Sequence, residues 1–332
     1  MTWFRRVFKQ LFLFVIMIEP KALFVERMKK LLPDEQDLTK FMSIIHEKPK
    51  NWIRCNTLKI TPEELKKKLE EKGWKISQKF KDYPEMMLIE NELGPGELGK
   101  SIEHLIGYYY VQEICSMMSV LALDCKPGEI VLDLCASPGS KTTQMAAKMQ
   151  NTGTIIANDK DLGRITILAA NLERCGATNT IITREDAVQL CVKLKEISMK
   201  FDRILVDAPC SGEGTLRSSP KTFIMWNVSM IEKLSRLQKK MVSSVLPLLK
   251  EGGVLVYSTC THAPEEDESV VSFLAEKFDM DVEEIYLPLK CRHGVEEWKT
   301  EKFKGSENVC RIYPQDNDSE GFFVAKLKKK PN

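Results

Sequence analysis

Short apolar runs alternate with amphipathic segments from about residue 108 to the end of the chain. Apolar runs with the length and flanking turns of strands lie at 128–135, 153–159, 180–186, 201–207, 253–259, 282–286, 311–313 and 322–328. Between them, apolar positions with helical spacing predict helices at 142–150, 162–175, 224–249 and 264–278. Strands that alternate with helices predict a doubly wound α/β fold with a parallel sheet.

The first 110 residues have a different pattern, which we interpret as a small α+β domain over 1–110 before a second domain over 111–332. The predicted elements are helices at 21–32 and 34–45, strands at 52–58, near 74 and at 86–89, and a helix with Thr61 as N-cap and Pro62 at its first position. A length of 332 residues also suggests about two domains.

An apolar run at 11–18 follows Arg5 and Arg6 near the amino terminus. The run is too short to span a membrane as a helix. It has the shape of a signal-peptide core, but no cleavage site of small residues follows it. We therefore expect a packed terminal helix or an upstream-extended start, with Met17 as an alternative initiator, and no membrane partner.

The bulk composition does not point to a nucleic-acid binder, because the net charge is only +2. Any such surface must arise from local clustering of basic side chains. The ten cysteines contain no C-x-x-C pair, so the spacing of a metal site is missing. Thiols that take part in chemistry must stay reduced, which predicts a cytoplasmic protein, although the spacing does not exclude a disulfide.

Acidic residues end three successive predicted strands, at Asp133, Asp159 and Asp186. The crevice outside the strand ends is where doubly wound sheets bind ligands, and carboxylates there can accept from a ribose diol and an adenine amino group. The turn at 135–141 offers small residues and backbone amides at a helix start. The alternative interpretation is that these acids only cap helices.

Two common nucleotide motifs are absent. The turn before Lys141 and Thr142 lacks the glycines of a phosphate-binding P-loop, and no G-x-G-x-x-G follows the first strand. A nucleoside triphosphatase and a nicotinamide enzyme are therefore disfavoured. S-adenosyl-L-methionine remains as the expected cofactor.

Cys210 and Cys260 each follow a short apolar strand, in Asp-Ala-Pro-Cys-Ser-Gly and Tyr-Ser-Thr-Cys-Thr. A free cysteine is more often a buried hydrophobic residue than a nucleophile. If the two strands are neighbours, however, both thiols and Asp207 face one pocket at the carboxyl edge of the sheet.

These motifs resemble those of the Sun/Fmu-type (Nop/Sun) RNA cytosine-5 methyltransferases. The matching segments run in family order at 54–59, 110–113, 133–142, 158–164, 185–186, 207–214, 257–261 and 265–268. The resemblance implies a Rossmann-like S-adenosylmethionine methyltransferase sheet with a small N-terminal α+β RNA-binding domain. It also implies cofactor contacts from Cys135, Ala136, Ser137, Pro138, Gly139, Ser140, Lys141, Asp159, Arg164, Asp186 and Asp207.

The same resemblance assigns roles to the reactive residues. Cys260 is expected to add to cytosine C6, which makes C5 nucleophilic toward a methyl group. Cys210 is expected to help break down the adduct, with Asp207 on the cytosine edge and Lys141 assisting electrostatically. Because DNA cytosine-5 enzymes carry their nucleophile in a Pro-Cys dipeptide, Cys210 as the attacking thiol is the alternative.

Several nearby residues have competing interpretations. His262 could form a dyad with Cys260, but a solvated loop histidine is favoured. Residues 265–268 are interpreted as the acidic first turn of a helix. Arg54, Asn56 and Lys59 are expected to contact RNA, while 66–68 fits a solvated helix face and 108–110 fits core packing better than base stacking.

The substrate is expected to be RNA, with tRNA favoured and rRNA as the alternative. Only about 50 residues separate the 54–59 and 110–113 segments, so an inserted RNA-binding domain has no room, as in the compact archaeal tRNA members. A monomer with no obligatory protein partner is expected. Methylation of a base amino group is disfavoured because no Asn/Asp-Pro-Pro-aromatic motif is present, and a catalytically silent RNA-binding protein is the non-enzyme alternative.

Overall fold

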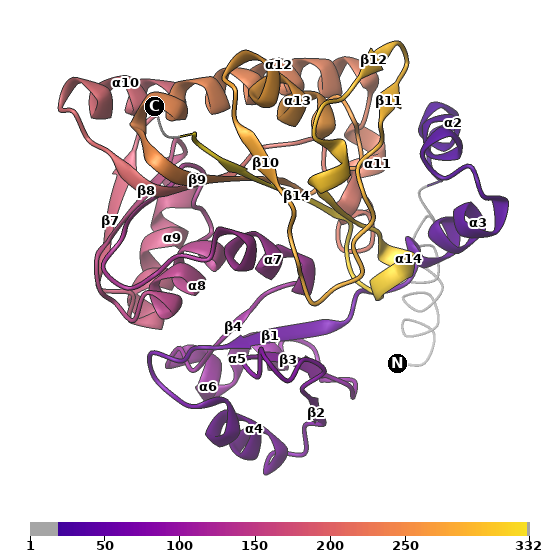
Figure 1. Ribbon diagram of the computed structural model, residues 1–332. Helices are drawn as coiled ribbons and strands as arrows, with labels where there is room; N and C mark the ends of the chain where they lie inside the picture. The colour runs from indigo at the N-terminus through magenta and orange to yellow at the C-terminus, as the bar shows by residue number, and fades with distance from the viewer. Residues whose placement is uncertain (1–18, 331–332) are drawn as a thin grey trace.

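The computed structural model describes residues 19–330. A large sheet with helices on both faces sits beside a small sheet with its own short helices (Figure 1). The predicted terminal helix at 11–18 and Met17 lie outside the described residues. Within 19–330, no helix combines the length and the apolar character that a membrane crossing needs.

The small sheet is antiparallel in the order β2-β3-β1-β4. Its strands are β1 (Asn51–Cys55), β2 (Ile76–Ser77), β3 (Met86–Ile89) and β4 (Tyr109–Val111), with helices α4 (Pro62–Glu70), α5 (Glu97–Lys100) and α6 (Ile102–Leu105). The Thr61 hydroxyl and the Glu64 carboxylate cap the start of α4 reciprocally, as the sequence pattern predicts. The sheet includes Val111, one residue past the predicted domain boundary.

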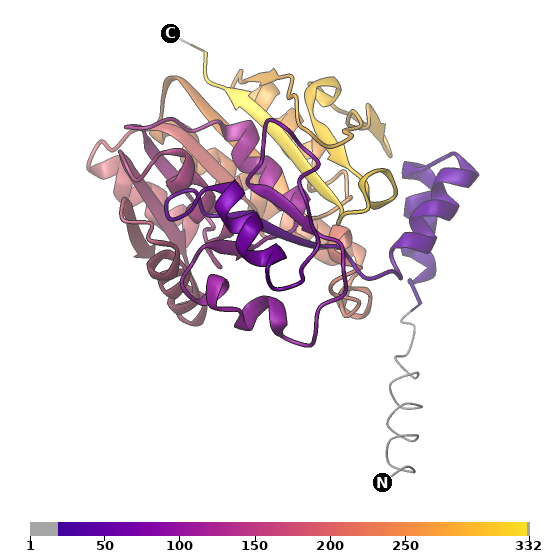
Figure 2. The ribbon, with the colours of Figure 1, turned by 90° about the horizontal axis from the view of Figure 1, so that it is seen from below.

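The first two described helices do not pack on this small sheet. Helices α2 (Ala22–Leu31) and α3 (Glu35–Ile44) lie beside the large domain instead (Figure 2). The Phe24 ring meets Phe223 and Trp226 edge-on at 5.5 and 5.6 Å. The chain before residue 110 therefore contributes to three hydrophobic clusters rather than to one compact unit.

The large sheet has the order β10-β14-β9-β8-β5-β6-β7, with β13 paired to β14. Its strands are β5 (Ile130–Asp133), β6 (Thr154–Asp159), β7 (Thr180–Arg184), β8 (Phe201–Asp207), β9 (Leu249–Thr259), β10 (Asp281–Glu283), β13 (Cys310–Ile312) and β14 (Phe322–Lys328). The prediction of a wholly parallel sheet is wrong at one edge, where β14 runs antiparallel to β9. The connection from β13 to β14 contains only the short helix α14 (Pro314–Asn317), so these two strands pair as an antiparallel hairpin. Strand β14 is the return strand of that hairpin and therefore runs against the direction of β9.

Helices cover both faces of this sheet (Figure 1). One face carries α7 (Ile114–Leu123), α8 (Ser140–Lys148) and α9 (Leu162–Cys175); the other carries α10 (Ala187–Glu196), α12 (Val228–Val245) and α13 (Glu268–Lys277). The predicted helix at 224–249 is divided, because the short α11 (Thr222–Met225) ends before the extended Trp226. Asn227 then caps α12 through its side chain. The minor elements are the hairpin β11 (Glu297–Trp298) and β12 (Glu301–Lys302) and three short 3₁₀ turns.

Strands β8 and β9 are parallel neighbours, with Asp207 opposite Ser258. The adjacency on which the sequence interpretation depends is therefore confirmed. Both cysteine-bearing loops leave the sheet at the same edge. A disulfide, which the cysteine spacing left open, joins Cys291 to Cys310, and Cys210 and Cys260 are free thiols.

Candidate active site

Two thiols meet just beyond the ends of β8 and β9. The Cys210 and Cys260 sulfur atoms are 3.2 Å apart, and both residues are partly exposed. Burial and the hydrogen bond with Cys260 raise the pKa of Cys210 well above its ordinary value, the hydrogen bond being the larger cause. The loop at Cys210 thus contacts the loop at Cys260 through the two thiols.

An ion pair lies next to the thiols. The Lys141 ammonium donates to Asp207 Oδ2 at 2.8 Å and to Ser116 Oγ at 2.9 Å. Burial lowers the pKa of Lys141, but Asp207, together with smaller contributions from Asp133 and Cys260, outweighs burial, so the pKa is raised. The Ser258 hydroxyl donates to the other carboxylate oxygen of Asp207 at 2.8 Å. Asp207 is consequently held in a fixed orientation by two donors.

Two cavities adjoin at this point. One of about 210 Å³ and one of about 440 Å³ share Asp207, Ala208 and Cys260 in their walls. The smaller reaches along the carboxyl ends of the parallel strands, and the larger opens between the two domains, where Trp52 and Phe322 line it. A reacting group in one cavity can therefore meet a reacting group in the other at Cys260.

The smaller cavity has the lining expected for a nucleoside. Asp159 lies in its wall, 3.3 Å from the Arg164 guanidinium, which also donates to the Ser137 carbonyl at 2.6 Å. Asp186 lines the same cavity while accepting from the Val188 and Gln189 amides at the start of α10. Asp186 is therefore both a helix cap and a cavity residue, so the two interpretations of this acid do not exclude each other.

One buried polar atom in the wall of the smaller cavity is consistent with the expected cofactor. The Ser137 hydroxyl is buried and lacks a hydrogen-bond partner within the described chain. A polar group in the cavity can satisfy it, since an unpaired buried hydroxyl is costly. Lys160, Leu237 and Met241 also line this cavity, and none of the three is predicted from the sequence. Leu237 and Met241 stand on α12, which is remote in sequence, and their helical spacing indicates only a buried face.

The turn at 135–141 offers fewer free backbone amides to a ligand than the sequence predicts. Cys135 and Ser137 line the smaller cavity, whereas Pro138, Ser140 and Lys141 line the larger one. The amides of Ala136 and Gly139 donate to the Asn158 and Ala136 carbonyls. These two amides are consequently occupied within the protein, contrary to the expectation that they face a ligand.

Asp133 lies outside the crevice in which the sequence pattern placed it. Its side chain is buried below the cavity floor and accepts from the Thr142 hydroxyl at 2.7 Å. Burial raises the pKa of Asp133 to about 7. This carboxyl fastens the start of α8 to β5 rather than lining either cavity.

The predicted RNA contacts at Arg54 and Asn56 are wrong in their geometry, because both side chains are buried. Arg54 donates to Gln112, to the Ser140 carbonyl and to the Thr143 hydroxyl. The Asn56 amide donates to the Gly107 and Cys175 carbonyls. Their donors join the small sheet to the large domain.

Lys59 and two of the three tyrosines at 108–110 also make contacts within the protein. The Lys59 ammonium donates to the Ile106 and Arg174 carbonyls, although the residue is exposed. Tyr109 and Tyr110 are buried, and the Tyr110 ring lies between the Arg54 and Arg174 guanidinium groups at 5.5 and 5.4 Å. Core packing of two tyrosines is confirmed.

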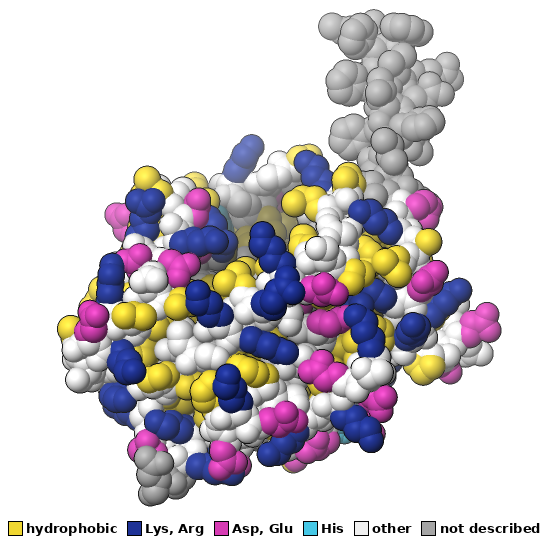
Figure 3. All heavy atoms as spheres, turned by 90° about the horizontal axis from the view of Figure 1, so that it is seen from above, with side chains coloured by type: hydrophobic (Ala, Val, Ile, Leu, Met, Phe, Trp, Pro, Cys, Tyr) yellow, Lys and Arg dark blue, Asp and Glu magenta, His cyan; other side chains and the backbone are white. Residues whose placement is uncertain are grey.

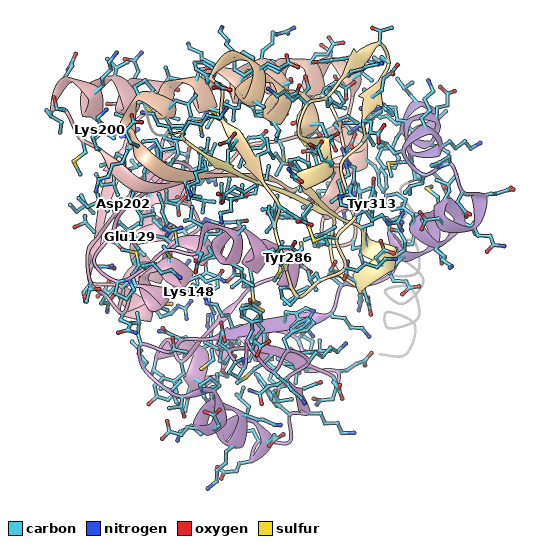
Figure 4. The ribbon with its side chains drawn as sticks, viewed as in Figure 1. Glu129, Lys148, Lys200, Asp202, Tyr286 and Tyr313 are labelled. Carbon is cyan, nitrogen blue, oxygen red and sulfur yellow. A yellow bond between two sulfur atoms is a disulfide. The ribbon has the colours of Figure 1, made fainter. Side chains whose placement is uncertain are left out.

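His262 does not act on Cys260. Its ring stacks on Tyr313 with centroids 4.9 Å apart, close to α14 and α3 (Figure 4). Burial, with a smaller contribution from Arg311, lowers the pKa of His262 to about 3. The histidine is thus a neutral, buried side chain and not the solvated loop residue that was favoured.

Only the last residue of the acidic run at 265–268 stands in the first turn of a helix, whereas the pattern predicts the whole run there. Helix α13 begins only at Glu268, and the acids turn inward. Their partners are Arg27 for Glu265, Ser211 and Gln238 for Glu266, Thr259 for Asp267 and Arg311 for Glu268. Within the run, Glu266 and Asp267 bond residues next to the two thiols.

The sheet order, the strand-end acids and the paired cavities define a Rossmann-like methyltransferase. The family description "16S rRNA methyltransferase RsmB/F" matches residues 120–328, and "N-terminal domain of 16S rRNA methyltransferase RsmF" matches residues 20–114. The chain belongs to the RsmB/F (Sun/Fmu) family, whose cofactor is S-adenosyl-L-methionine, so the expected family and cofactor are confirmed.

Two curated relatives illustrate the range of the family. The chain is 40% identical over 314 residues to a tRNA (cytosine(49)-C(5))-methyltransferase of Pyrococcus abyssi, covering 92% of this chain and 95% of that one. It is also 40% identical over 314 residues to ribosomal RNA small subunit methyltransferase F of Psychromonas ingrahamii, covering 93% of this chain but only 63% of that one. The chain thus spans less than two thirds of the rRNA relative.

Solved structures agree with this assignment. A methyltransferase homolog from Pyrococcus horikoshii superposes with a TM-score of 0.82 at 31% identity, covering 95% and 97% of the two chains. NSun6 from the same organism, crystallised with SFG, superposes with a TM-score of 0.81 at 26% identity, covering 94% and 99%.

Proposed function

We propose that this protein methylates C5 of cytosine in tRNA, with Cys260 as the nucleophile. The observation that carries the proposal is the junction of the two cavities at Cys260 and Asp207. A target cytosine in the larger cavity and a cofactor in the smaller one would meet at that junction. The base must be unstacked or single-stranded to enter.

When bound, S-adenosyl-L-methionine supplies the methyl group. The Cys260 thiolate forms a bond to cytosine C6, which moves electron density to C5 and makes it nucleophilic. After C5 has gained the methyl group, a base takes the C5 proton. The electrons of that C–H bond form the C5–C6 double bond, and the bond between sulfur and C6 breaks to return the Cys260 thiolate. Cys210 is the group within reach of that second stage, since its sulfur lies 3.2 Å from Cys260.

Asp207 would orient the base during the first stage. Its carboxylate is held by Lys141 and Ser258, so it can address the N3 and N4 edge of cytosine without reorganising. Lys141 adds a positive charge beside Asp207 and Cys260, where it can assist electrostatically.

The preference for tRNA is supported by the P. abyssi tRNA enzyme, to which this chain is 40% identical over 314 residues. An rRNA substrate is the second candidate, favoured by the family description. Lysine and arginine side chains lie around a hollow on the face in Figure 3, where they can contact phosphates.

Bisulfite sequencing tests the reaction and the substrate together. Unmodified tRNA and small-subunit rRNA are incubated with the protein and S-adenosyl-L-methionine, and Cys260→Ala serves as the inactive control. Protected cytosine in tRNA supports the proposal, and protection only in rRNA supports the second candidate. RNA binding without transfer of a labelled methyl group would instead identify a silent RNA-binding protein.

We further propose that the protein is a monomer that needs no protein partner. We also propose that it is cytoplasmic and that it divides into domains near residue 110. Light scattering of the purified protein at several concentrations tests the first of these.

A further inference from the structure

Cys210 is held from both sides by one pair of buried side chains. The Gln238 amide donates to the Pro209 carbonyl at 2.9 Å, and the Ser211 amide donates to Glu266 Oε2 at 3.0 Å. Gln238 also donates to the same Glu266 oxygen at 2.8 Å. The backbone on each side of Cys210 is therefore fixed by a connected pair from α12 and the loop before α13.

The neighbouring acid holds the other thiol loop. The Thr259 hydroxyl donates to Asp267 Oδ1 at 2.5 Å, one residue before Cys260. The Ser211 and Thr261 hydroxyls lie 2.7 Å apart and connect the two loops directly. Consecutive residues of one segment, Glu266 and Asp267, consequently fix the two cysteines relative to each other.

This arrangement is costly for stability. Glu266, Asp267 and Gln238 are fully buried, and Glu266 Oε1 is without a hydrogen-bond partner in the described chain. Burial raises the pKa of Glu266 to about 7. Apolar side chains of similar size would make such a site at least as stable. We therefore infer that these polar groups serve to position their neighbours rather than to stabilise the fold.

We propose that Glu266, acting with Gln238, is a positioning residue that holds Cys210 against Cys260, while Asp267 positions Cys260. None of the three is required to touch the substrate. The consequence for catalysis rests on the function proposed above. Loss of the Glu266 contacts then impairs adduct breakdown, whereas loss of the Asp267 contact impairs adduct formation.

Glu266→Ala and Glu266→Gln separate the positional role from charge. Alanine removes the acceptor for Ser211 and Gln238, whereas glutamine retains a carbonyl oxygen that can accept from Ser211. Glu265→Ala is the matched control, because Glu265 is in the same run but bonds Arg27 and Trp298, away from the thiols. We expect Glu266→Ala to slow methylation by roughly 10- to 100-fold with accumulation of RNA adduct. Glu266→Gln and Glu265→Ala should remain near wild type.

A measurement without RNA tests the geometry by itself. The thiol oxidant diamide accepts the two thiol hydrogens as a disulfide forms between Cys210 and Cys260. The rate of disulfide formation in the full chain is followed by peptide mass mapping. Wild type, Glu266→Gln and Glu265→Ala should react alike, and Glu266→Ala at least about fivefold slower, because a freed loop lowers the effective concentration of its thiol. A Glu266→Ala rate equal to or above that of wild type overturns the proposal.

The two measurements distinguish the two proposals. If the wild type transfers no methyl group but the oxidation rates differ as expected, the positioning role stands and the proposed function fails. If Glu266→Ala is misfolded by circular dichroism, Gln238→Leu replaces it, because that change removes the donor to Pro209 and to Glu266 while keeping an apolar side chain in α12. Unchanged oxidation in folded Gln238→Leu contradicts the proposal.

Discussion

Cys210 and Cys260 are 50 positions apart in the chain, yet their sulfur atoms lie within 3.2 Å. The contact exists because β8 and β9 are parallel neighbours and release their following loops at one edge. Two thiols in contact can divide a covalent cycle between attack and release. The proposed division of roles predicts which of the two cysteine variants stays covalently bound to RNA.

Replacement of each thiol should give opposite phenotypes. Cys210→Ala should accumulate a covalent protein–RNA adduct, because the adduct forms at Cys260 but breaks down slowly. Cys260→Ala should form none. A denaturing gel of each protein after incubation with tRNA and cofactor measures the adduct, and the reverse pattern would assign the attack to Cys210.

Lys141→Met should weaken catalysis without unfolding the protein. The change removes a charge-assisted hydrogen bond from Asp207, worth about 2 kcal/mol, or roughly 30-fold in rate. Lys148→Met at the opposite end of α8 is the matched control (Figure 4). Initial rates of labelled methyl transfer provide the measurement, and equal rates in the two variants would remove Lys141 from the site.

Asp159→Asn should reduce cofactor affinity by roughly 30-fold, which corresponds to about 2 kcal/mol for one charge-assisted hydrogen bond. Isothermal titration with S-adenosyl-L-methionine measures the change. Asp161→Asn is the control, because Asp161 caps α9 and does not line the cavity. Wild-type affinity in Asp159→Asn would exclude the carboxylate as a ribose partner.

Arg54→Ala should destabilise the fold rather than selectively weaken RNA binding. It leaves several buried acceptors unpaired between the domains, which we expect to lower the free energy of unfolding by about 3 kcal/mol. Lys67→Ala on the exposed face of α4 should change it by less than about 0.5 kcal/mol. Urea titrations measure both values, and unchanged stability with lost RNA affinity would restore Arg54 as an RNA contact.

His262 should make the protein sensitive to acid. Its folded pKa of about 3 lies below the ordinary value of 6.5, so the unfolded chain binds the proton first. The contribution of His262 to the free energy of unfolding is complete above pH 6.5. It falls as the pH drops toward 3, by at most about 1.4 kcal/mol per pH unit.

Comparison with His262→Phe isolates that contribution, since other titrating groups are common to both proteins. The difference in the free energy of unfolding should change steadily between pH 6 and 4 and be constant above 7. A pH-independent difference would show that His262 titrates normally.

Local patterns in the sequence determined most of the elements of the large domain. Strands β5, β6 and β8 lie within predicted runs, and Thr61 starts a helix as predicted, because apolar periodicity and capping act over a few residues. The sequence by itself also determined which side chains stand at strand ends, including Asp207 and Cys210.

Only the tertiary structure decided which of these groups meet. The β8–β9 pairing brings the thiols together, whereas Arg54 and Asn56 turn inward because a second domain covers them. Likewise, Glu266 faces Ser211 rather than solvent. Short-range patterns fix the conformation of a segment, but contacts between distant segments depend on sheet order and on the burial that the whole chain achieves.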